Sequence, residues 1–103
     1  MRTAKVKMHD IEAGLLSERD DKAYSFQYHP AYQGPAISLT MPIRTEAYMY
    51  DRFPAFFDGL LPEGVQLEGL LKIRKIDCYD YFSQLLATGA DLVGAVSVFP
   101  IHE

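Results

Sequence analysis

The sequence predicts an α+β fold, in which a small antiparallel β-sheet, built as a meander, combines with about three short helices and a closing C-terminal strand. Two observations support this prediction. In the first half of the chain, apolar and polar residues alternate, a pattern typical of half-buried strands. In the second half, apolar residues recur three or four positions apart, as on one face of a helix, before a last apolar run restores strand character.

The first half of the chain contains the runs with strand character, separated by turn-prone segments. They span residues 4–8, 11–16, 24–28 and 37–41. Gly14, inside the second run, predicts a bulge or a close approach of backbone. We expect Tyr32 to fold back onto the sheet and Pro42 to end the fourth run. These spacings favour an antiparallel meander.

The first helical segment begins after Asp51, a predicted N-cap, and has Pro54 in its first turn. Pro62 ends this segment, because the residue before a proline is pushed out of the α region. Its apolar side chains follow at helical spacing and are Phe53, Phe56, Phe57, Leu60 and Leu61.

A second amphipathic segment and a third helix precede the closing strand. The apolar residues of the second segment are Leu67, Leu70, Leu71 and Ile73. Basic residues in its last turn complement the helix dipole. We expect Asp77 to cap the third helix, which ends near Gly89. The run from Leu92 to Phe99 is apolar on both faces, so we expect this strand to lie at the centre of the sheet.

Length and charge limit what the chain can do. A length of 103 residues fits a single domain, residues 1–103, and excludes most complete enzymes that bind a nucleotide between two lobes. With 14 acidic and 10 basic side chains, the formal net charge of −4 argues against direct binding of nucleic acid. No apolar run approaches the ~18 residues of a membrane span, and the single Cys78 excludes an internal disulfide framework. We therefore expect a cytoplasmic location.

Sequence spacing does not predict a catalytic site, a metal site or a bound cofactor. His9, His29 and His102 lack a metal-ligand partner three or four positions away, and no phosphate-binding glycine loop is present. The segment Phe57–Gly59 has the letters of a kinase's metal-binding Asp-Phe-Gly in another order, inside a helical pattern.

Other residues that could carry chemistry have simpler structural interpretations. Cys78 could be a nucleophile at a helix start, but acidic neighbours oppose a thiolate and a buried structural cysteine is favoured. We interpret the carboxylates as solvated surface groups and the aromatic strand residues as core, rather than as an acid/base pair and an RNA platform. These residues are Glu46, Asp58 and Glu63 for the carboxylates, and Tyr24, Phe26 and Tyr28 for the aromatics.

The most informative segment runs from Phe53 to Gly64. Several large apolar side chains are followed there by the rigid turn Pro62–Gly64. A domain of this size has little core with which to cover so much apolar surface, and an exposed remainder would mark a protein interface. Val65 would then be a small apolar tip after the turn.

A set of segments in fixed order covers most of residues 4–100. They are Tyr24–Tyr28 with the following Tyr32, Ile37–Pro42, Phe56–Gly64 and Leu85–Val96. Each segment is weak alone, but in this order they resemble the N-terminal subdomain of HipA-type serine/threonine kinase toxins. In that family the subdomain precedes the kinase lobes in one longer chain and packs on the nucleotide-binding lobe.

The chain stops at Glu103 without kinase motifs, so it resembles the split version of the family. There the subdomain is a separate protein, HipS, beside a shortened kinase toxin, HipT, and a HipB-like helix-turn-helix protein. The resemblance implies a non-enzymatic antitoxin that binds and neutralises a HipT-like kinase, with a HipB-like protein as the candidate third component. It also implies that the kinase acts on an aminoacyl-tRNA synthetase.

We expect the partner to bind at the turn and its flanking helices. The expected partner-binding residues are Phe57, Leu60, Leu61, Pro62, Glu63, Gly64, Val65 and Gln66. In full-length relatives a basic or large residue often follows the Pro-Glu-Gly turn, whereas Val65 follows it here. The alternatives are an activating or scaffolding subunit that completes a split HipA-type kinase, a small enzyme of unknown type, and a DNA-binding autorepressor, which the net charge disfavours.

Overall fold

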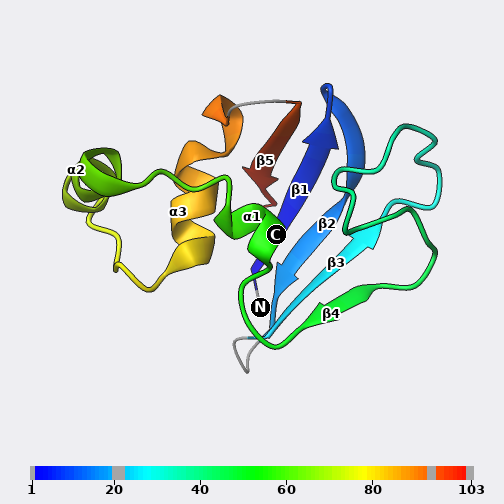
Figure 1. The fold of residues 1–103 in the computed structure, drawn as a ribbon, viewed down its shortest axis with the longest axis horizontal. Coiled ribbons are helices and arrows are strands. Elements are labelled where there is room, and N and C mark those ends of the chain that lie inside the picture. Colours follow the sequence, from blue (N-terminus) through cyan, green and yellow to red (C-terminus); the bar gives the residue numbers. More distant parts are fainter. Residues whose placement is uncertain (1, 20–22, 93–94, 102–103) are drawn as a thin grey trace.

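A computed structural model describes residues 2–19, 23–92 and 95–101 of the chain (Figure 1). In this part of the chain, one antiparallel sheet has the strand order β4-β3-β2-β1-β5, and helices lie on one of its faces. The strands are β1 (Arg2–Met8), β2 (Ile11–Glu18), β3 (Tyr24–Tyr28), β4 (Tyr48–Tyr50) and β5 (Val96–Pro100). The helices are α1 (Ala55–Asp58), α2 (Gly64–Arg74), α3 (Tyr81–Thr88) and the 3-10 turn η1 (Gly89–Asp91). The predicted α+β fold, with a meander and a closing strand, is confirmed.

Strands β1 and β2 form a hairpin whose register shifts between Val6 and Lys7. Gly14 pairs with Val6 beside this bulge, and a Cβ at Gly14 would stand 2.4 Å from the carbonyl oxygen of Gln27 on β3. Only glycine fits such a close approach of neighbouring backbone. The bulge and close approach predicted from Gly14 are therefore confirmed.

The prediction of a fourth strand over residues 37–41 is wrong. Residues 37–41 form a tight turn with one isolated bridge, and the fourth strand of the sheet is β4. The amide of Ile37 donates to the hydroxyl of Tyr28, which in turn donates to the carbonyl of Met41. Ile37 and Met41 are buried because both ends of the turn face the core, whereas Leu39 at its tip is fully exposed. The alternation of apolar and polar residues in this segment thus comes from a turn whose two ends are buried in the core, not from a strand.

The closing strand is also placed differently from the prediction. β5 begins at Val96 rather than Leu92 and lies at an edge of the sheet, where it pairs with β1. Residues 93–94 lie outside the described part of the chain. Val96 and Val98 face the core, and Phe99, on the opposite face, packs under the ammonium group of Lys7 at 5.0 Å. An edge strand is apolar on both faces here because a lysine stem and charge cover the outer ring.

Two predicted helix caps are wrong. Asp51 does not cap α1, which is a single turn of four residues that begins after Pro54. Asp80, not Asp77, caps α3, because its side chain accepts a hydrogen bond from the amide of Ser83. Asp77 instead accepts from the amide of Tyr79 and shapes the turn before the helix. An aspartate suits both a helix cap and a turn, so the sequence pattern did not show which role Asp77 and Asp80 each have.

The core lies between the sheet and the helices α1 and α3. Its ring contacts join the strand aromatics to the helices, for example Phe26 to Phe57 with ring centroids 6.0 Å apart. Tyr32 is buried and stacks on Tyr28, as predicted. None of the helices in the described residues is both long and apolar enough to span a bilayer.

Candidate interaction surface

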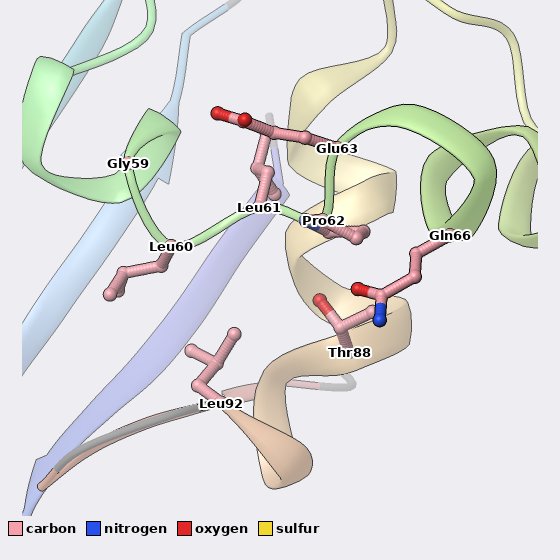
Figure 2. Close-up of a pocket in the computed structure, with 8 residues that line it drawn as sticks. All are labelled: Gly59, Leu60, Leu61, Pro62, Glu63, Gln66, Thr88 and Leu92. Carbon is pink, nitrogen blue, oxygen red and sulfur yellow. The ribbon is translucent and has the colours of Figure 1, made fainter.

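The connector between α1 and α2 lines a surface pocket of about 570 Å³ (Figure 2). The opposite wall of the pocket comes from the end of α3 and from the segment after η1. The lining residues are Gly59, Leu60, Leu61, Pro62, Glu63, Gln66, Thr88 and Leu92. Five members of the predicted partner-binding set therefore lie together around one concavity.

Local backbone chemistry produces the connector. After the single turn of α1, the amides of Leu60 and Leu61 still donate to carbonyls three residues back, so the chain turns tightly. Pro62 has no amide hydrogen and stops this winding. Gly64 then adopts φ +61°, a left-handed conformation that favours glycine, and starts α2 in a new direction.

The predicted partner-binding residues divide into an exposed group and a buried one. Val65 is 84% exposed, and Glu63 and Gln66 are also exposed, whereas Leu60 and Leu61 are half-buried and pack on the edge of the core. Phe57 is completely buried. Its ring packs in the core against Phe26 and is not available to a partner. The prediction of Phe57 as a partner-binding residue is therefore wrong.

Helix α2 differs from the amphipathic segment that was expected. None of its eleven residues is buried. Leu67, Leu70 and Leu71 are half-buried, Ile73 is 81% exposed, and α2 contacts α3. Figure 1 shows α2 standing away from the sheet, beyond α3. The helix is thus held mainly by α3 and offers apolar side chains to solvent.

An ionic network fixes α3 against the first strand. The guanidinium of Arg2 donates to both carboxylate oxygens of Glu18, at 2.7 and 2.9 Å, and to Asp80 at 2.8 Å. The hydrogen bond from Arg2 lowers the pKa of Glu18. Burial alone would raise the pKa of Asp80, but the hydrogen bonds from Arg2 and Ser83 lower it below its usual value. The network therefore anchors the N-terminal end of α3, the helix whose last residue, Thr88, lines the pocket.

Thr88 and Leu92 line the pocket but were not among the predicted site residues. They lie more than twenty positions from the connector in the sequence, and only the packing of α3 brings them to it. Thr88 is the last residue of α3, and its hydroxyl donates to the carbonyl of Gln84 in the same helix. No spacing signal in the sequence connects these residues to the turn.

The described residues hold no group of three or more His, Cys, Asp or Glu side chains that could bind a metal ion. Cys78 is exposed, so its interpretation as a buried structural cysteine is wrong. It lies in the turn before α3, where the backbone carbonyl of Cys78 accepts a hydrogen bond from Gln84 and the side chain is left outside. Glu46, Asp58 and Glu63 are exposed, as expected.

These features define a class of protein: a small α+β domain whose most distinctive surface is an apolar pocket beside an exposed, lightly anchored helix. The chain belongs to the HipA N-terminal domain family, whose model matches residues 4–99. It is similar to the solved N-terminal domain of HipA toxin, with a TM-score of 0.79 and 30% identity, over 100% of this chain and 95% of the other.

A relative from Haemophilus influenzae, an uncharacterised protein, is 35% identical over 98 residues, which cover 95% of this chain and 92% of the relative. The predicted resemblance to the HipA N-terminal subdomain is confirmed. The chain is a HipA-related toxin–antitoxin component, and the matches concern the N-terminal domain rather than the kinase domain.

Proposed function

We propose that the chain is the antitoxin of a three-component, HipBST-like system, and that it neutralises a shortened HipA-like serine/threonine kinase by binding it in the cytoplasm. The single observation that supports this role best is the exposed apolar tip Val65 beside the pocket formed by Leu60, Leu61 and Pro62. Exposed apolar groups next to a concavity are typical of protein interfaces. The proposed partner is a HipT-like kinase, with a HipB-like helix-turn-helix protein as third component.

The proposed mechanism is steric and requires no chemistry from this chain. Pro62 restricts the backbone of the turn, so less conformational entropy is lost there when the turn binds, and Gly64 permits the left-handed conformation that starts α2. The tip would enter the kinase and either block access of its substrate or hold its lobes in an inactive arrangement. A short side chain such as Val65 fills only a shallow recess, so the flanking Leu61 and Gln66 would add to the contact.

The test is co-purification with a short, HipT-like kinase, together with rescue of growth when both are expressed. We expect Val65→Asp and Leu61→Asp to lose binding and rescue, because a carboxylate would be desolvated in an apolar contact. Ile11→Asp, at an exposed apolar position on β2, is the matched control and should keep both. Circular dichroism is used to check that each of these variants is folded. Intact rescue by folded Val65→Asp and Leu61→Asp variants would show that this surface is not the site.

The alternative is an activating or scaffolding subunit that completes a split kinase through the same surface. The same purified proteins decide between the two roles. Phosphorylation by the kinase should fall when the chain is added if it is an antitoxin. A rise in kinase activity on adding the chain would reject the antitoxin role and support the alternative.

A further inference from the structure

The outward face of α2 has an apolar pattern that the domain itself leaves uncovered. Val65, Gly69 and Ile73 are four positions apart, so they lie on one face of the helix. The two apolar side chains at the ends are both more than four-fifths exposed. They stand about 12 Å apart, given a rise of about 1.5 Å per residue. A Cβ at Gly69 would meet nothing within 4 Å, so a gap separates the two side chains.

The end of the same helix is basic. Lys72, Arg74 and Lys75 are exposed, and among the described residues none of them forms an ion pair. Basic residues at a helix C-terminus complement its dipole, which accounts for their placement but leaves their charges in solvent. In a chain with a net charge of −4, this cluster is a local excess of positive charge.

The domain gives α2 little support. An isolated helix of eleven residues is marginal in water, and α2 contains Gly69 and buries no residue. It packs against α3 through one side. A helix with these properties gains stability when a partner covers its outward face.

We propose that the outward face and basic end of α2 extend the docking surface, and that their occupant is an apolar patch bordered by acidic side chains on the same kinase. This inference rests on the proposed function. Val65 lies between Glu63 and Gln66, which both line the pocket, so the pocket and the α2 face adjoin and can form one contact, with Ile73 as a second apolar anchor. The acidic border follows from charge complementarity with Lys72, Arg74 and Lys75.

The test measures binding of the full chain to a catalytically inactive form of the proposed HipT-like kinase at about 50 mM and about 500 mM salt. The double variant Lys72→Glu/Lys75→Glu should associate about tenfold more slowly at low salt, with the difference shrinking at high salt, where charges are screened. Its control is Arg19→Glu/Arg52→Glu, which changes the charge by the same amount at exposed positions outside α2. This control should bind as the unmodified chain does.

The apolar half of the surface is tested by Ile73→Asp, which should weaken binding about tenfold or more, against Ile11→Asp as control. Circular dichroism is again used to check that each variant is folded. If Val65→Asp loses binding but the α2 variants bind normally, the inference fails and the proposed function stands. If the unmodified chain does not bind the kinase, both fail. A loss in the charge variant that is equal at both salt concentrations also overturns the acidic border.

Discussion

The ionic network around Arg2 offers the most direct test of how the fold is held together. Arg2→Met keeps a long apolar side chain over the ring of Phe82, from which the guanidinium carbon is 4.9 Å, but removes the charge. It leaves the carboxylates of Glu18 and Asp80 without the cation that joins β1 to β2 and to α3.

The magnitude follows from the contacts and their exposure. A hydrogen bond to a charged group contributes about 1.5–3 kcal/mol when it is well shielded. The side chain of Arg2 is 41% exposed, so solvent screening reduces the electrostatic part. We expect the free energy of unfolding to fall by about 2 kcal/mol at neutral pH, which for a domain of this size lowers the melting temperature by about 10 °C.

The pH dependence separates charge from packing. The folded-state pKa values of Glu18 and Asp80 are lowered, so their contribution is fully present above the unfolded values near pH 4. It is lost as pH falls through the folded values, because both carboxylates then take up protons. The stability difference between the unmodified chain and Arg2→Met should therefore be largest at pH 7 and shrink below about pH 4.

Urea unfolding followed by circular dichroism at pH 7 and at pH 3 measures the loss of unfolding free energy and its dependence on pH. Lys5→Met is the matched control, since its ammonium lies 3.9 Å from Glu12 in an exposed pair and should contribute less than about 0.5 kcal/mol. An unchanged stability for Arg2→Met at pH 7 would refute the argument that the network holds α3. A loss of the same size at both pH values would show that Arg2 acts through its cation–π contact with Phe82 rather than through the two carboxylates.

Two further substitutions test the close contacts of the core. Gly89→Ala should destabilise the domain by more than ~2 kcal/mol in urea unfolding, because its Cβ would stand 1.8 Å from the carbonyl oxygen of Val98. A stability within ~0.5 kcal/mol of the unmodified chain would contradict this contact. Tyr28→Phe should lower the melting temperature by roughly 10 °C, because the amide of Ile37 and the carbonyl of Met41 lose their buried partner. Tyr48→Phe, whose hydroxyl bonds to an exposed carbonyl, is its control and should change little.

The sequence identified local features where side-chain type alone dictates conformation. Alternation located β1 and β3, and a run after a turn-prone segment located β2. Gly14 indicated the close approach to β3, and the Pro62–Gly64 turn was recognised from its proline and glycine. Asp77 was predicted as the cap of α3 in place of Asp80, because both have the same capping chemistry and only the path of the chain decides which one is used. Asp51 was predicted to cap α1, which has no side-chain cap.

Periodicity and ordered motifs were sufficient to predict the α+β class, the family and the turn that lies at the centre of the candidate surface. Which residues are exposed depends instead on how the elements pack. The tertiary structure buried Phe57, exposed Cys78 and α2, and brought Thr88 and Leu92 to the pocket. Burial depends on which elements pack together, and contacts between residues far apart in the chain leave no periodic signal in the sequence. For the same reason, the sequence did not show that β5 lies at the edge of the sheet.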